Sequence, residues 1–164
     1  MKKIINPWIN RTGYNCICCS PENPRGLHLE FWEDGEDIVT YWHPHADYQG
    51  WINTLHGGIQ AMLMDEIGGW VVTRKLQTTG VTSKMEVQYL KPIPTEEEKL
   101  TIRGHIARQM RNVAFIETQI ENEAGEVLSK ATLTYFCASK EKALETMGFT
   151  GCEVEDAKSD ACEA

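Results

Sequence analysis

The feature that most constrains the fold is a single long helix-like segment among segments with strand patterning. Apolar and polar residues alternate in six segments, as they do in half-buried β-strands: 27–33, 36–43, 80–91, 99–110, 112–122 and 126–138. Residues 57–75 instead have the apolar spacing of an amphipathic helix. Turn residues separate the strands, and Asp34-Gly35 is the strongest of these signals. We therefore predict the order β–β–α–β–β–β–β.

In this order one long helix has to cover one face of a six-stranded antiparallel sheet. A sheet that wraps a single helix is the layout of the α+β hotdog fold, and two such protomers usually join their sheets edge to edge. We assign residues 27–139 to this domain, residues 1–26 to a leader with a cysteine-rich loop, and residues 140–164 to a short helix with an acidic tail. We expect a homodimer or a dimer of dimers.

The predicted helix carries two adjacent carboxylates close to its apolar face. On a helical wheel one arc collects six apolar residues: Ile59, Met62, Leu63, Ile67, Trp70 and Val71. Glu66 falls inside this arc and Asp65 lies at its flank. Small residues gather on the opposite side and would let another backbone come close: Gly57, Ala61 and Gly68. Because a carboxylate that faces a core must be paired, hydrogen-bonded or protonated, we expect at least one of these acids to have a partner or a chemical task.

The start of this helix is suited to binding a carbonyl oxygen. The first N–H groups of a helix lack partners within the helix and lie at its positive end. Gly57 and Gly58 have no side chains, so an oxyanion that develops during acyl transfer can approach these groups, although a tight turn would also explain glycine here. Asp65 lies about 12 Å further along the axis. A reaction that uses both groups on one carbonyl therefore needs two antiparallel copies of the helix.

Composition and charge exclude several classes of protein. The 164 residues suffice for one domain, and a formal net charge of −8 argues against nonspecific binding to nucleic acid. No segment approaches the ~20 apolar residues of a membrane span, and the N-terminus lacks the apolar run of a signal peptide. We therefore expect a cytoplasmic protein whose six cysteines are free thiols.

Three stretches resemble one known family. LHGGIQAMLMDE (55–66) followed by GVTSKMEVQYLKP (80–92) resembles the acyl-CoA thioesterases of the hotdog superfamily, in the branch of the phenylacetate-pathway thioesterase. Upstream, CICCSPENPRGLHLEF (16–31) resembles a leader of many members that begins with a CxxC pair, which Cys16 and Cys19 match. The resemblance covers most of the chain, and it implies hydrolysis of an acyl-CoA thioester.

The resemblance also implies roles for single residues. Asp65 matches the catalytic carboxylate, as nucleophile or as general base on water, and the N–H of Gly57 matches the donor that polarises the thioester carbonyl. His56 matches a histidine that holds the loop or a water, and Thr82 matches a hydroxyl that orients the nucleophilic water. The helical wheel makes Glu66 the more buried acid, for which we expect a structural role with hydrogen bonds to loop backbone.

Further candidates would bind the substrate around this centre. Gly58 accompanies Gly57 at the helix start, and a polar side chain near the thioester comes from Gln49 or Asn53. Trp51 is a candidate for the acyl pocket, although core packing is the ordinary role of a tryptophan. Basic residues on one predicted strand and its turn either hold the phosphates of CoA or form a solvated edge: Arg103, Arg108 and Arg111.

No cofactor and no metal is expected, because CoA is part of the substrate. A zinc site at Cys16, Cys18 and Cys19 is a weaker alternative, since no second CxxC exists. It would have to be completed by one of three other residues: Cys152, Cys162 or His28.

Two other functions stay open beside hydrolysis of acyl-CoA. One is a non-catalytic protein that binds acyl-CoA. The other is a hotdog dehydratase or hydratase, whose pattern has the catalytic histidine in a different loop followed by Pro-Gly. The intact Asp65 favours catalysis, and the HGG sequence disfavours a dehydratase. The acyl group is left open by the sequence.

Overall fold

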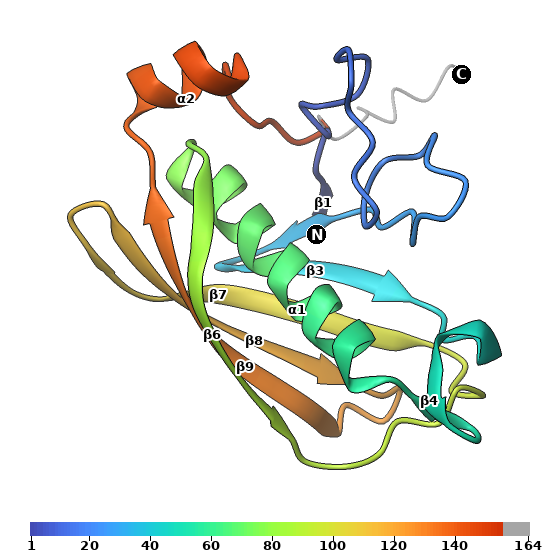
Figure 1. The fold of residues 1–164 in the computed structure, drawn as a ribbon. Helices are drawn as coiled ribbons and strands as arrows, with labels where there is room; N and C mark the ends of the chain where they lie inside the picture. The colour runs from blue at the N-terminus through green and yellow to red at the C-terminus, as the bar shows by residue number, and fades with distance from the viewer. Residues whose placement is uncertain (156–164) are drawn as a thin grey trace, which may run out of the picture.

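A curved antiparallel sheet wraps around helix α1 (Gly57–Val71) in the computed structural model, which describes residues 1–155 (Figure 1). The sheet has seven strands in the order β1-β2-β3-β7-β8-β9-β6. Their bounds are β1 (Lys2–Lys3), β2 (Trp32–Asp34), β3 (Asp37–Trp42), β6 (Gly80–Tyr89), β7 (Leu100–Met110), β8 (Val113–Glu121) and β9 (Val127–Cys137). This is the hotdog layout that the sequence predicts, with α1 between the second and third of the six predicted strands.

The first predicted strand is much shorter than expected. Only Trp32–Asp34 pairs with β3, whereas residues 27–31 run beside the leader, where Leu27 and Leu29 donate backbone hydrogen bonds to carbonyls of the leader. His28 has a φ of 52°, which breaks the extended conformation between them. A seventh strand, β1, which the sequence analysis did not predict, pairs with Trp32 and Glu33 of β2. The loop before α1 adds a short helix η1 (Ala46–Tyr48) and a ribbon of β4 (Gln49–Trp51) and β5 (Thr54–Leu55).

Helix α1 packs its apolar face into the concave side of the sheet. Leu63, Ile67 and Val71 have no exposed surface, as the helical wheel predicts for their arc. The small-residue side also faces the sheet, because a Cβ on Gly68 would lie 3.1 Å from the side chain of Leu133 and 3.2 Å from that of Tyr135. At Gly68 side chains of β9 occupy the place that the prediction leaves open for another backbone, and at Gly57 the nearest neighbour is the ring of Tyr89 on β6.

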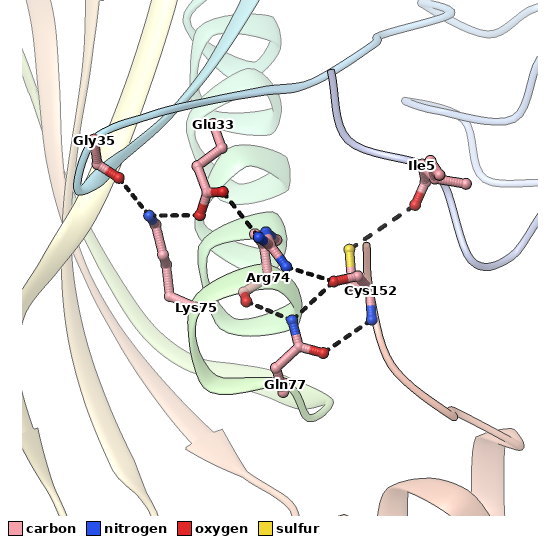
Figure 2. A network of polar contacts seen from close by, with 7 residues as sticks. All are labelled: Ile5, Glu33, Gly35, Arg74, Lys75, Gln77 and Cys152. Carbon is pink, nitrogen blue, oxygen red and sulfur yellow. Dashed lines mark hydrogen bonds and ion pairs between the residues drawn. The ribbon is translucent and has the colours of Figure 1, made fainter. Parts of the chain in front are cut away.

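The end of α1 continues as a π-helical turn, η2 (Val72–Leu76), which together with Gln77 binds β2 and the C-terminal segment at Cys152 (Figure 2). Arg74 and Lys75 bind the two carboxylate oxygens of Glu33 at 2.9 and 2.8 Å. Burial alone would raise the pKa of Glu33, but the hydrogen bonds and charges of Arg74 and Lys75 outweigh it and lower this pKa. Arg74 and Gln77 also donate to the carbonyl of Cys152, at 2.7 and 2.9 Å.

The segments outside the sheet contribute to the same apolar core. Buried residues of the leader and of the C-terminal part join it, among them Ile4, Cys18, Phe149 and Cys152. Helix α2 (Lys140–Met147) forms where the sequence predicts it. The predicted acidic tail lies largely outside the described residues, as does Cys162. Among the described residues no helix is long and apolar enough to cross a membrane.

Candidate active site

Two hydroxyl groups of the sheet hold the carboxylate of Asp65. The hydroxyl of Thr82 donates to Asp65 Oδ1 at 2.7 Å. The hydroxyl of Tyr135 lies 2.9 Å from the Asp65 carbonyl oxygen and 3.3 Å from Oδ1. Thr82 on β6 and Tyr135 on β9 are direct cross-strand partners, so both side chains stand on the face of the sheet that α1 covers. The carboxylate is thereby fixed in position by residues from two strands.

Tyr135 is a site residue that the sequence analysis missed. Only 3% of its surface is exposed, and this burial together with the charge of Asp65 raises the pKa of its phenol. The period-two pattern of β9 contains the signal that could have revealed it. Ala131, Leu133 and Tyr135 alternate with more exposed residues, which puts a phenol on the inner face among apolar side chains.

The start of α1 leaves one backbone donor free. The imidazole Nδ1 of His56 caps the helix by accepting from the N–H of Gly58 at 2.8 Å. The next two N–H groups, of Ile59 and Gln60, both donate to the carbonyl of His56. The N–H of Gly57 has no acceptor within the described part of the chain. Of the two glycine N–H groups, Gly57 therefore presents the donor that is available to a ligand.

The free N–H of Gly57 belongs to a cavity of about 590 Å³ that lies at this end of α1. Tyr89 closes one side, and its hydroxyl donates to the Gly57 carbonyl at 3.0 Å. Trp51 also lines the cavity, but 83% of its surface is exposed in a single chain. Figure 1 shows this end of the helix beside β4.

The two polar candidates of the preceding loop bind other protein groups. The side-chain oxygen of Gln49 accepts from the N–H of Asn53 at 3.2 Å. The amide of Asn53 donates to Glu96 at 3.1 Å and accepts from the hydroxyl of Thr95 at 3.0 Å. Asn53 therefore fixes the loop, and neither Gln49 nor Asn53 lines the Gly57 cavity.

Asp65 lines a second cavity, of about 520 Å³, together with Glu66, Thr82, Tyr135 and residues of the leader. The two cavities have no lining residue in common within the described chain. The carboxylate and the free N–H thus belong to two separate cavities of the described chain.

Glu66 is the largely buried neighbour of Asp65. The indole N–H of Trp70 donates to its Oε1 at 2.9 Å, and the thiol of Cys16 lies 3.7 Å from its Oε2. The expected hydrogen bonds to loop backbone are therefore replaced by contacts with side chains. Burial and the charge of Cys16 raise the pKa of Glu66, against the opposing effect of hydrogen bonds from Cys19 and Trp70.

The basic candidates lie apart from both of these cavities. Arg103 forms ion pairs with three carboxylates, of which Asp37 is the nearest at 2.7 Å. Arg103 lines a third cavity, of about 490 Å³, to which α1 contributes no residue. The guanidinium of Arg108 lies 4.3 Å from the ring centre of Phe115, and Arg111 occupies the turn after β7 with a φ of 52°. Within one chain none of these arginines lines the cavities of Asp65 or Gly57.

Comparisons with known proteins place part of the chain close to one superfamily. Residues 52–129 match the family model of the thioesterase superfamily. Human acyl-coenzyme A thioesterase 13 is 29% identical over 85 residues, which are 51% of this chain and 60% of that protein. The chain thus matches less than two thirds of the length of its curated relatives.

Solved structures show the same fold. A hypothetical thioesterase protein from Streptococcus pneumoniae TIGR4, determined with coenzyme A, is 28% identical, with a TM-score of 0.62 over 68% of this chain and 89% of that one. Zebra fish thioesterase superfamily member 2 is 24% identical, with a TM-score of 0.62 over 71% and 88%. Two further pneumococcal structures are of alanine variants, at an aspartate and at a threonine sixteen positions later. The chain thus has the fold of these hotdog thioesterases, and its residues 52–129 match the thioesterase superfamily.

Proposed function

We propose that this protein hydrolyses acyl-CoA thioesters to a free carboxylate and CoA. The superfamily match, the names of the curated relatives and the coenzyme A in the pneumococcal structure support this substrate class. We further propose that the protein belongs to the phenylacetate-pathway branch, that it is located in the cytoplasm and that it binds acyl-CoA as its substrate.

One observation carries the mechanism: the Asp65 carboxylate and the free N–H of Gly57 belong to the same helix but line separate cavities. Asp65 follows Gly57 by eight residues, or about 12 Å along the axis, which is too far for both groups to reach one carbonyl. Two antiparallel helices in a homodimer would bring Asp65 of one subunit to Gly57 of the other. Such a dimer holds two equivalent sites, and a dimer of dimers would hold four.

In this mechanism each residue has a distinct task. The Gly57 N–H donates a hydrogen bond to the thioester oxygen as negative charge develops on it. Asp65 either attacks the carbonyl carbon or removes a proton from the attacking water. Thr82 and Tyr135 keep the Asp65 carboxylate in the required orientation, and His56 keeps the helix start in place. No cofactor takes part, because CoA leaves as the thiol product.

The pairing of an aspartate with a threonine has a parallel in the pneumococcal protein. Its two alanine variants lie sixteen positions apart, whereas Asp65 and Thr82 are seventeen positions apart. The π-helical turn Val72–Leu76 lies between Asp65 and Thr82.

The three arginines differ in how well each could bind a phosphate of CoA. Arg103 already balances three carboxylates, so it has little charge to offer to a phosphate. Arg108 and Arg111 are more exposed and remain the proposed contacts for CoA phosphates. A protein that only binds acyl-CoA is the second candidate, since the free N–H would serve binding as well as catalysis.

A thiol-release assay over aromatic, short-chain and medium-chain acyl-CoAs tests the proposal. We expect wild type to hydrolyse at least one class and Asp65→Asn to lose nearly all of that activity. Glu66→Gln is the matched control at the neighbouring position, and it should retain the larger part. Full activity of Asp65→Asn would refute the assigned mechanism. Tight binding of acyl-CoA without thiol release would identify a binding protein.

A further inference from the structure

The leader and helix α1 bring a second group of chemically active side chains together beside Asp65. The thiols of Cys16 and Cys19 and a carboxylate oxygen of Glu66 all lie within 4.8 Å of one another. Cys16 and Glu66 are fifty residues apart in sequence, so the fold and not the local chain creates this group. None of the three has a role in the proposed hydrolysis.

The partly buried carboxylate of Glu66 has no positively charged side chain as a partner in the described part of the chain. Trp70 satisfies Oε1, and Oε2 points to Cys16 at 3.7 Å. Within residues 1–155 no lysine, arginine or histidine forms an ion pair with Glu66. A carboxylate taken out of water without such a partner is costly, unless a proton or a metal ion is bound to it.

The separation between Cys16 Sγ and Glu66 Oε2 fits a tetrahedral zinc ion. Zn–S bonds of about 2.3 Å and Zn–O bonds of about 2.1 Å give a sulfur–oxygen separation of about 3.6 Å at the tetrahedral angle. The distance between Cys16 Sγ and Glu66 Oε2 is 3.7 Å. Small side-chain rotations would bring Cys19 Sγ to the same ion. Thiolates are soft ligands, which favours Zn²⁺ over Mg²⁺ or Ca²⁺.

Neighbouring groups orient all three ligands. The backbone N–H of Cys18 donates to Cys16 Sγ at 3.3 Å, and the hydroxyl of Tyr14 lies 3.0 Å from Cys19 Sγ. The indole of Trp70 holds Glu66 by its other oxygen. Outer partners of this kind are what fix the ligands of metal sites. The side-chain amide of Asn6 in turn donates to the hydroxyl of Tyr14 at 2.9 Å and so supports the cluster from the N-terminal segment.

We propose that Cys16, Cys19 and Glu66 bind one Zn²⁺ ion that ties the leader to helix α1. The fourth position faces the cavity that all three ligands line, and a water completes it there. Binding releases the thiol protons to solvent, with no change of oxidation state. The ion is a structural clamp next to Asp65 and lies outside the sequence of bond changes in hydrolysis. The proposal does not depend on the thioesterase function.

Metal analysis of the full chain tests this site directly. Protein stripped with a chelator under reducing conditions should take up one equivalent of Zn²⁺ per chain and unfold at a higher temperature. Co²⁺ in place of Zn²⁺ should give a thiolate-to-metal charge-transfer band in the near ultraviolet. Cys16→Ser, Cys19→Ser and Glu66→Gln should each weaken Zn²⁺ binding at least tenfold. Cys137→Ser is the matched control, because Cys137 lies outside the cluster, and it should bind like wild type.

Two results would overturn the proposal. One is a stripped protein that takes up no Zn²⁺ while its thiols stay reduced, or that forms a Cys16–Cys19 disulfide and no metal complex. The other is uptake that the three substitutions leave unchanged, which would place the metal elsewhere. If the Glu66→Gln variant is less stable than wild type, the cobalt spectrum still gives an answer. Its folded fraction retains both thiolates, so the charge-transfer band shows whether Co²⁺ is bound by a changed set of ligands.

Discussion

Mixing two inactive variants gives the sharpest test of a site that two subunits share. One chain carries Asp65→Asn and lacks the carboxylate, and the other carries Gly57→Pro and lacks the N–H. Proline suits the first helical position, and His56 before it already has the extended conformation that a following proline requires (ψ 133°). In a mixed dimer, one site combines both defects and the other combines intact Asp65 with intact Gly57.

The expected activity follows from the number of intact sites. Removal of one oxyanion donor costs about 10²–10³ in kcat, so each variant alone should be almost inactive. In an equal mixture with random pairing, half of the dimers are mixed and each has one intact site. The mixture should therefore recover about one quarter of wild-type activity. If Asp65 and Gly57 of the same chain acted together, no dimer in the mixture would have an intact site.

The assay is thiol release after the two variants are refolded together or co-expressed with different affinity tags. Gly57→Ala is the matched control. It places a Cβ at the same 3.2 Å from the ring of Tyr89 but keeps the N–H, so it should retain most activity. Mixed dimers, isolated by both tags, that show no more activity than the parent variants would refute the shared site. High activity of Gly57→Pro alone would refute the role of its N–H.

Three further substitutions test the structure around this site. Thr82→Val removes the 2.7 Å hydrogen bond to Asp65 and should lower kcat about tenfold, whereas Thr82→Ser should keep most of it; equal losses would contradict the role of the hydroxyl. Glu33→Gln should reduce the free energy of unfolding by about 2 kcal/mol at pH 7. The lowered pKa of Glu33 means that this contribution is present above the ordinary glutamate pKa and is lost as the pH falls below it, so urea curves of variant and wild type should converge in acid. Leu63→Ala, at a side chain with no exposed surface, should cost about 2–5 kcal/mol in the same assay; a loss under 1 kcal/mol would contradict its place in the core.

Hydrophobic periodicity was sufficient to predict the sheet and the helix, because both bury one face. It failed where hydrogen bonds to distant chain segments decide the conformation. Residues 27–31 alternate like a strand, yet the leader takes up their backbone donors and His28 adopts a positive φ. A pattern within one segment contains no information about such a partner.

In the candidate site, too, features of one segment could be predicted, whereas contacts between distant segments could not. Gly57 follows from the start of the helix, which is a local feature of the chain. Asp65 is preferred to Glu66 only because of the family resemblance, since the helical wheel favours Glu66. Tyr135 lies seventy residues from Asp65, and only the pairing of β6 with β9 brings its hydroxyl there. The contact between Glu66 and Cys16 also depends on tertiary structure, because nothing in the helical sequence indicates where the leader will lie.

The irregularities on either side of Thr82 bear on how this chain can change in length. A π-helical turn precedes Thr82, and the pairing of β6 with β9 shifts by one residue between Thr82 and Lys84. Each irregularity absorbs one residue. Without such a device, a single insertion or deletion would turn a helical side chain by about 100° and move a strand side chain to the opposite face. The direction in which the Thr82 side chain points therefore does not depend on the exact length of the helix or of the rest of its strand. At these two irregularities evolution or design can add or remove a residue while the Thr82 hydroxyl still points to Asp65.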